Sequence, residues 1–155
     1  MREANRGKLT DMSIVDVSLI SGNKHIDSRG IVSFFNDFKM SNVMRFYVVE
    51  HPNMNIVRAW QGHRHEQKWF YVVCGAFSVA VIKPDDWNEP SKDLKPNFFY
   101  LQASKPELLH IPGGYVTGFN SLEKNSKMIV YSDSTVEESQ KDDYRFEMDT
   151  WFGGW

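Results

Sequence analysis

Short runs of apolar residues recur along the chain, and turn-forming residues separate them. The run 14–20 alternates apolar and polar residues, as a half-buried strand does. Several later runs are rich in the β-branched and aromatic residues that strands favour, and we expect strands there: 31–35, 44–50, 68–73, 76–83, 98–101, 107–111 and 128–132. Many short strands separated by Gly and Pro turns indicate an all-β sandwich or barrel.

Two places in the pattern predict other local structures. Cys74-Gly75 lies between two apolar runs, and this arrangement predicts a β-hairpin. Helical spacing is found only over 136–145, where Ser134 or Thr135 could serve as the N-cap. We find no internal repeat and no linker, so we expect one domain over 1–155 whose polar first ten residues are mobile.

Composition narrows the function classes. A chain of 155 residues with 41% hydrophobic residues can bury a sizeable core, and its net charge of −2 offers no basic field for nucleic acid. No apolar run is long enough to span a bilayer, and the first residues lack the apolar region of a signal peptide. The single cysteine, Cys74, excludes an intrachain disulfide. We therefore expect a cytoplasmic protein without a membrane or nucleic-acid partner.

The segment 58–75 holds the densest group of reactive side chains. An arginine, two histidines, a glutamate, a glutamine and a lysine precede a run of β-favouring residues that stops at a glycine. Ionisable groups at the entrance of such a strand suggest a polar site at the mouth of a barrel. Trp60 lies inside this segment and Phe119 beside a later polar turn, so either ring could stack on a base or a sugar.

Several side chains could carry chemistry at this site. His63 and His65 are two residues apart, so on a strand they would project from one face, as metal ligands do. Two imidazoles alone rarely hold a metal, because three protein ligands are the usual minimum, and we expect no metal here. Lys68 opens an apolar strand, either as a solvated end-of-strand charge or as a cation that faces the pocket and stabilises an enolate oxygen. Tyr131 alternates with apolar residues; its ring is packed or its hydroxyl acts as an acid.

Arg29 and Arg58 each precede a predicted strand. Either could be a plain surface charge. Two arginines on loops before strands could instead bind a pyrophosphate through bidentate hydrogen bonds.

A series of blocks in this order resembles the dTDP-4-dehydrorhamnose 3,5-epimerases, which are metal-independent, dimeric cupins. The blocks are Asp27-Ser28-Arg29-Gly30, Arg58, Gln67-Lys68 leading to Val-Val-x-Gly, Ile111-Pro112-x-Gly114 followed by Gly118-Phe119, and Tyr131. The nucleotide-sugar 3,4-ketoisomerases are similar as well. Their Arg-x-Tyr strand resembles Arg45-Phe46-Tyr47, and their Asp-Tyr-x-Arg resembles Asp143-Tyr144-Arg145 without the intervening residue.

The chain departs from both families at the position of the base. The residue three after the counterpart of Arg58 is a histidine there and Gln61 here, and a carboxamide cannot take a proton at neutral pH. Thr117 stands where metal-binding cupins place the histidine of their second motif. The glutamate expected after Arg29-Gly30 is replaced by the apolar region around Phe34.

The resemblance implies a cupin-type jelly roll, a homodimer, and a cofactor-free epimerase acting on a nucleoside-diphosphate 4-keto-6-deoxy sugar. It suggests His63 as base, Lys68 as enolate stabiliser and Tyr131 as acid. For substrate binding it suggests two arginines and four neighbouring side chains: Arg29, Arg58, Gln61, Gln67, Trp60 and Phe119. A 3,4-ketoisomerase of the same substrates, a non-catalytic sugar-nucleotide-binding protein and a two-histidine metal cupin remain alternatives.

Overall fold

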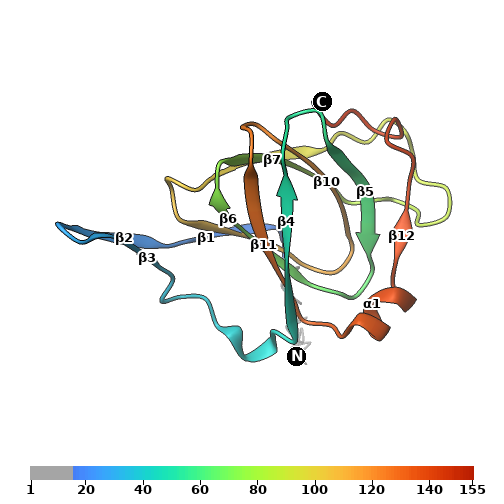
Figure 1. Cartoon of the computed structure of the whole chain (residues 1–155). Helices are drawn as coiled ribbons and strands as arrows, with labels where there is room; N and C mark the ends of the chain where they lie inside the picture. Colours follow the sequence, from blue (N-terminus) through green and yellow to red (C-terminus); the bar gives the residue numbers. More distant parts are fainter. Residues whose placement is uncertain (1–15) are drawn as a thin grey trace, which may run out of the picture.

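The computed structural model describes residues 16–155, and the segment 1–10 that was expected to be mobile lies outside these residues. Two five-stranded antiparallel sheets face each other, as Figure 1 shows. The first sheet has the order β1-β9-β6-β11-β4, with bounds Ser18–Ser21, Glu107–Ile111, Lys68–Cys74, Ser126–Ser132 and Arg45–His51. The second has the order β12-β5-β10-β7-β8, with bounds Tyr144–Arg145, Val57–His63, Tyr115–Ser121, Ala76–Ile82 and Asn97–Gln102.

The core forms where the inner faces of the two sheets meet. Alternate residues of each strand point inward, such as Phe70 and Val72 on β6 or Met128 and Val130 on β11, and all four are buried. They pack against β7, which is buried along its whole length. The prediction of an all-β fold is therefore confirmed.

The connection between β6 and β7 differs from the hairpin that we predicted. The two strands do not pair: β6 lies in the first sheet and β7 in the second. Gly75 makes this corner alone, with a φ of +71° that favours glycine. A Cβ at Gly75 would lie 2.9 Å from Cβ of Ser126, too close for any side chain. One residue thus turns the chain from sheet to sheet.

The C-terminal segment covers the outer face of the second sheet. After α1 (Val136–Lys141), whose predicted N-cap Thr135 forms a capping box with Glu138, the chain pairs with β5 as the edge strand β12. The indole of Trp151 then packs on Trp60 at a ring-centroid distance of 5.5 Å. Within residues 16–155, no helix is long and apolar enough to cross a membrane.

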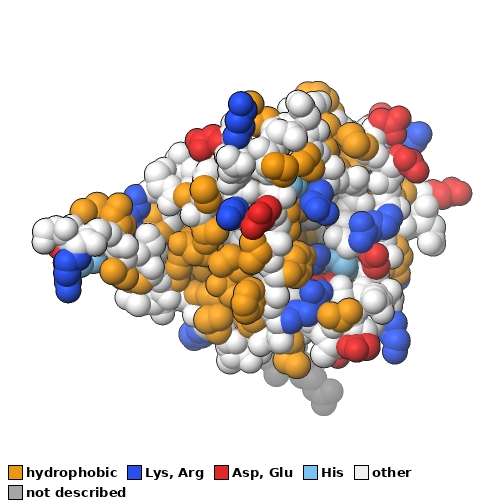
Figure 2. Space-filling model, viewed as in Figure 1, with side chains coloured by type: hydrophobic (Ala, Val, Ile, Leu, Met, Phe, Trp, Pro, Cys, Tyr) orange, Lys and Arg blue, Asp and Glu red, His pale blue; other side chains and the backbone are white. Residues whose placement is uncertain are grey.

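A two-stranded hairpin, β2 (Asn23–Asp27) and β3 (Gly30–Phe34), projects away from the barrel (Figure 1). A single turn of 3-10 helix, η1 (Met40–Asn42), follows it before β4 begins. The outer face of the first sheet exposes apolar side chains, including Phe46 and Val48 of β4, and Figure 2 shows a broad apolar area on this side of the molecule.

Candidate active site

A cavity of about 480 Å³ opens between the sheets. Apolar side chains, among them Val49, Phe70 and Phe119, form part of its lining. Polar side chains from both sheets complete it: Tyr47, Arg58, Gln61, Lys68, Thr117 and Arg145. This mixture of an apolar surface with a few placed polar groups is typical of a small-molecule site.

A β-bulge explains how Arg58 and Gln61 both reach the cavity. Side chains three residues apart on a regular strand point to opposite faces. Here the register between β5 and β10 shifts, so that Thr117 is opposite Gln61 and Phe119 is opposite Arg58. The extra residue on β5 restores both side chains to the cavity side.

Lys68 lies on β6, the central strand of the first sheet, and points inward like Phe70 two residues later. Only 7% of the residue is exposed. Burial, which disfavours the ammonium form, is the largest cause that lowers the pKa of Lys68, from 10.5 to about 8. A solvated charge at the end of a strand, the plainer interpretation of Lys68, does not fit this position.

His63 occupies a different place from the one that we predicted for a base. It is 5% exposed, and Lys68 borders the cavity whereas His63 does not. Its Nε2 lies 2.8 Å from Lys68 Nζ, and its Nδ1 lies 2.7 Å from the carbonyl oxygen of Asp142. Burial, followed by the charge of Lys68, lowers the pKa of His63. The prediction that His63 meets the substrate directly is therefore corrected: His63 meets Lys68.

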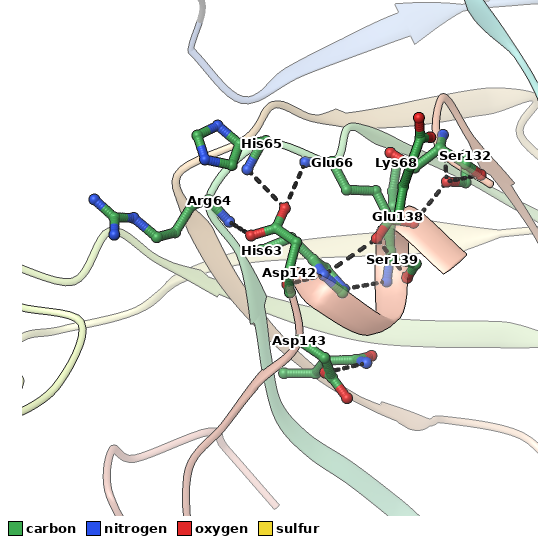
Figure 3. Close-up of polar contacts among 12 residues, drawn as sticks. His63, Arg64, His65, Glu66, Lys68, Ser132, Glu138, Ser139, Asp142 and Asp143 are labelled. Carbon is green, nitrogen blue, oxygen red and sulfur yellow. Dashed lines mark hydrogen bonds and ion pairs between the residues drawn. The ribbon is translucent and has the colours of Figure 1, made fainter. Parts of the chain in front are cut away.

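Glu66 holds this arrangement together from within the protein (Figure 3). Its side chain is 1% exposed, and Oε2 lies 3.1 Å from His63 Nδ1. The carboxylate also accepts hydrogen bonds from three other segments: Arg45 Nη2 at 3.2 Å, Ser132 Oγ at 2.6 Å and Ser139 Oγ at 2.8 Å. A buried carboxylate with this many donors is fully paired.

Asp142 fixes the turn that carries His63 and Glu66. Its carboxylate accepts the backbone N–H groups of Arg64, His65 and Glu66 at 2.8, 2.8 and 3.0 Å (Figure 3). These three hydrogen bonds outweigh the effect of burial and lower the pKa of Asp142. The end of α1 is thus tied to the turn between β5 and β6.

The opposite wall of the cavity is built around Gln61. Its Nε2 donates to Asp143 Oδ1 at 2.9 Å, and Arg145 Nε donates to the same oxygen at 2.9 Å. Burial raises the pKa of Asp143, but the hydrogen bonds from Gln61 and Arg145 lower it by more. Thr117 stands opposite Gln61 on β10. Position 61 itself holds a carboxamide, and the titratable group beside it is the carboxyl of Asp143.

The tyrosine that borders the cavity is Tyr47, not Tyr131. On β11, Val130 points into the core, so Tyr131 lies on the outer face, where its ring packs on Phe38 and Phe46. Tyr47 points inward from β4, and burial is the largest cause that raises its pKa to about 12. The prediction of Tyr131 as a cavity acid is wrong for this reason. The Arg-x-Tyr block was the sequence signal for Tyr47.

Arg29 and Arg58 do not form the joint anion site that we predicted within one chain. Arg58 borders the cavity. Arg29 lies at the turn of the β2–β3 hairpin, where its side chain is 85% exposed and pairs with Asp27 at 2.6 Å. The second arginine at the cavity is Arg145, from β12.

The three remaining predicted substrate contacts differ in whether they can touch a ligand. Phe119 borders the cavity, as we predicted. Trp60 also borders it, but its indole packs on Trp151 and donates to the carbonyl oxygen of Met148, so the ring is engaged on the outer side of the sheet. Gln67 is absent from the cavity lining, because its amide bonds Asp133 and His110 instead. Stacking of Trp60 on a ligand and a direct contact by Gln67 are thus not supported.

The donors for a metal ion do not converge in residues 16–155. No three His, Cys, Asp or Glu side chains there lie in a geometry that could hold one. His65 is exposed at the turn, while both ring nitrogens of His63 face protein groups. The two histidines therefore do not form the pair that their spacing suggested.

The structure resembles solved structures of proteins with known activities, although the sequence does not match known families. No protein-family model and no curated protein matches the sequence. The 3,4-ketoisomerase QdtA from Thermoanaerobacterium thermosaccharolyticum, in complex with TDP, superposes with a TM-score of 0.67 at 14% identity, over 88% of this chain and 93% of that chain. The rmlC epimerase of Mycobacterium tuberculosis gives 0.69 at 14% identity, over 88% of this chain and 71% of that chain.

The 3′-monoepimerase ChmJ from Streptomyces bikiniensis, in complex with dTDP-quinovose, gives a TM-score of 0.71 at 14% identity, over 88% of this chain and 72% of that chain. The chain shares its fold with these epimerases and 3,4-ketoisomerases. The predicted cupin-type jelly roll is therefore confirmed.

Proposed function

We propose that this chain binds a nucleoside-diphosphate 4-keto-6-deoxy sugar in the cavity and isomerises the sugar by moving protons next to the ketone. The observation that carries the proposal is the buried amine of Lys68 on the wall of a cavity whose exposed rim holds Arg58 and Arg145. The ligands of proteins with the same fold support the substrate class: a QdtA variant is described in complex with TDP-4-keto-6-deoxyglucose, and ChmJ with dTDP-quinovose.

The chemistry needs no cofactor. A ketone at C4 of the sugar acidifies the C–H bonds at C3 and C5, and loss of one proton leaves an enolate. A cation beside the enolate oxygen stabilises it, and Lys68 supplies that charge in a partly dry site. A proton returned to the opposite face of the same carbon inverts it, and we propose 3,5-epimerisation as the main reaction. Tyr47 takes the place of Tyr131 as the acid in this proposal.

Two arginines at the rim would hold the diphosphate. Arg58 has no ion-pair partner among the described residues, and Arg145 shares its charge with Asp143. Guanidinium groups suit this task because they bind phosphate oxygens bidentately. Gln61 and Phe119 remain in the proposal as contacts to the sugar or the base.

A homodimer is part of the proposal. The exposed apolar side chains Phe46 and Val48 on the first sheet would be covered by a symmetric partner. Arg29, which projects on its hairpin, could reach a diphosphate only in another copy of the chain. Light scattering at micromolar concentration tests the dimer, and a monomer would contradict it. The cytoplasm stays the proposed location, supported by a free thiol as the only cysteine, Cys74.

Two other functions are each favoured by one observation. Tyr47 follows Arg45 on the inner face of β4, as in the Arg-x-Tyr strand of ketoisomerases, and this favours migration of the ketone between C3 and C4. Gln61 and Thr117 face each other without a base, and this favours a protein that binds the sugar nucleotide without turning it over.

Incubation in deuterated water with a panel of nucleoside-diphosphate 4-keto-6-deoxy sugars, followed by proton NMR, tests the proposal. We expect deuterium at C3 or C5, with inversion of configuration for an epimerase or migration of the ketone for a ketoisomerase. Calorimetry on the same panel measures binding. Binding without exchange would replace the enzyme by the binding protein, and absence of both would contradict the proposed function.

A further inference from the structure

The missing imidazole at position 61 leaves open which group removes the proton. Among the described residues that line the cavity, the titratable ones are Tyr47, Arg58, Lys68 and Arg145. Arginine keeps its proton at every accessible pH. Tyr47 holds its proton firmly because burial raises its pKa to about 12. Lys68 is the lining group that can present a lone pair near neutral pH.

The surroundings of Lys68 hold its amine in one orientation. Two acceptors face Nδ1 of His63: the carbonyl oxygen of Asp142 at 2.7 Å and Oε2 of Glu66 at 3.1 Å. We therefore assign the ring proton to Nδ1, which leaves a lone pair on Nε2. That lone pair accepts a hydrogen bond from Lys68 Nζ at 2.8 Å. One N–H of the amine donates to His63. The lone pair of the neutral amine can then face the cavity.

We propose that Lys68 is the proton-abstracting base of this site, and that His63 and Glu66 are positioning residues that orient its amine. The inference rests on the proposed function and deepens it. It reverses the expected order of roles, in which His63 takes the proton and Lys68 only carries charge. The chain would thus replace the imidazole of the similar families with an amine from the other sheet.

Lys68 can accept the proton that leaves the sugar, and Tyr47 can supply the proton that returns to it. The lone pair of neutral Lys68 takes the proton at C3 or C5; the C–H bond breaks, an N–H bond forms, and the electron pair moves onto the ketone oxygen as an enolate. The new ammonium then lies beside the enolate it has created. Tyr47, on β4 of the same sheet, gives its hydroxyl proton to the carbon, and the electron pair of the enolate forms the new C–H bond. Both side chains regain their starting states by exchange with water.

The charges around Lys68 set the pH at which this works. Glu66 and Asp143 favour the ammonium, whereas Arg45, Arg145 and above all burial disfavour it, and the pKa settles at about 8. Burial lowers the pKa of His63, so His63 stays neutral above pH 7. Between pH 7 and pH 9, the neutral fraction of Lys68 thus rises about tenfold, and the exchange rate should rise with it.

The first test needs no substrate. The protein is labelled with 13C at the lysine Cε, and its lysines are titrated by NMR, with Lys68→Arg to assign the signal and Lys92→Met as a surface control. We expect one signal with a midpoint near pH 8 that is missing in Lys68→Arg. A midpoint near 10.5 for Lys68 would overturn the proposal, whatever the protein does to sugars.

The second test separates a base from a cation. Deuterium exchange into TDP-4-keto-6-deoxyglucose is measured for the parent and for Lys68→Arg, which keeps the charge but cannot release a proton. We expect the variant to lose about 10³-fold in rate, within the range of acid–base catalysis. Exchange within about tenfold of the parent would show that Lys68 only stabilises the enolate. Absence of exchange in the parent with any sugar of the panel would remove the proposed function, and this inference with it.

The third test addresses His63 as a positioning residue. His63→Phe removes the acceptor of the Lys68 hydrogen bond, whereas His63→Gln can offer an amide oxygen in its place. We expect His63→Phe to bind TDP like the parent, to exchange more than tenfold more slowly and to lower the midpoint of the pH profile, and His63→Gln to recover most of the rate. An unchanged rate and midpoint in His63→Phe would contradict the role of His63.

Discussion

The two polar walls of the cavity differ in how deeply they are built into the fold. Lys68 belongs to a buried network in which His63 and Glu66 have every polar atom engaged. Gln61 belongs to a partly exposed group whose partner, Asp143, is shared with Arg145 on the rim. A substitution at the first wall would leave buried charges unpaired. After a substitution at the second wall, water can hydrate the polar groups that lose their partner. Substitutions should therefore cost less stability at the wall that holds Gln61 than at the wall that holds Lys68.

The largest expected difference between the walls is in stability. Glu66→Ala removes the acceptor for Arg45, His63 and two hydroxyl groups, and we expect a loss of about 3–5 kcal/mol in the free energy of unfolding, the scale for breaking a buried pair. Asp143→Ala is the matched change at the other wall and should cost less than about 1 kcal/mol. Urea denaturation measures both. Similar losses would show that the walls are equally embedded.

The second prediction concerns stability against pH. The pKa of Lys68 is lowered from 10.5 to about 8, so between these values the unfolded chain binds a proton that the folded chain does not. Stability therefore rises with pH in this window, and the cost of the buried charge is constant below it. Relative to Lys68→Met, the parent should gain about 1.5 kcal/mol in the free energy of unfolding from pH 8 to 9.5. If the free energies of unfolding of the two proteins changed with pH in the same way, Lys68 would not be a buried charge with a lowered pKa.

The third prediction concerns the rim. Arg58→Ala should weaken binding of TDP by about 1.5–3 kcal/mol, the scale of a charge-assisted hydrogen bond, and should reduce the salt dependence of the affinity. Arg64→Ala is the control, because Arg64 is an exposed arginine absent from the cavity lining. Calorimetry in low and high salt measures both. Equal affinities for the parent and Arg58→Ala would assign the diphosphate to other residues.

The smallest expected effect comes from restoring an imidazole to the second wall. Gln61→His should change stability by less than about 0.5 kcal/mol, because the half-buried side chain of Gln61 borders an open cavity that can take a larger ring. If the proposed reaction occurs, the exchange profile should gain activity below pH 8, where imidazole is a competent base and the Lys68 amine is mostly protonated. If the exchange rate of Gln61→His depended on pH as it does in the parent, the side chain at position 61 would not contact the reacting carbon.

Much of the fold could be predicted from the sequence, since alternation and β-favouring residues marked most strands; β9 matches its predicted range completely. β5 was missed as a strand in its own right because its inward positions are polar rather than apolar. The pairing of β6 was wrong because a single glycine, Gly75, looks the same in a hairpin and in a corner between sheets.

The candidate site was predicted less completely, for three physical reasons. Tyr47 and Tyr131 both alternate with apolar residues, and only the assembled sheets decide which side of each strand is inside. The bulge that brings Arg58 beside Gln61 depends on the register with β10, a long-range property. Arg29 pairs locally within a hairpin that stands apart from the barrel, and nothing in its own sequence shows this.

The network around Glu66 also has a consequence for biosynthesis. Its partners come from β4, the end of β5, the end of β11 and helix α1, so the last contact along the chain comes from Ser139. Until β11 and α1 have joined the earlier segments, the carboxylate of Glu66 lacks the hydrogen bonds from Ser132 and Ser139. The nascent chain cannot complete this centre early, and such long-range closure is slow. Assembly of the environment of Lys68 therefore depends on docking of α1 against the barrel.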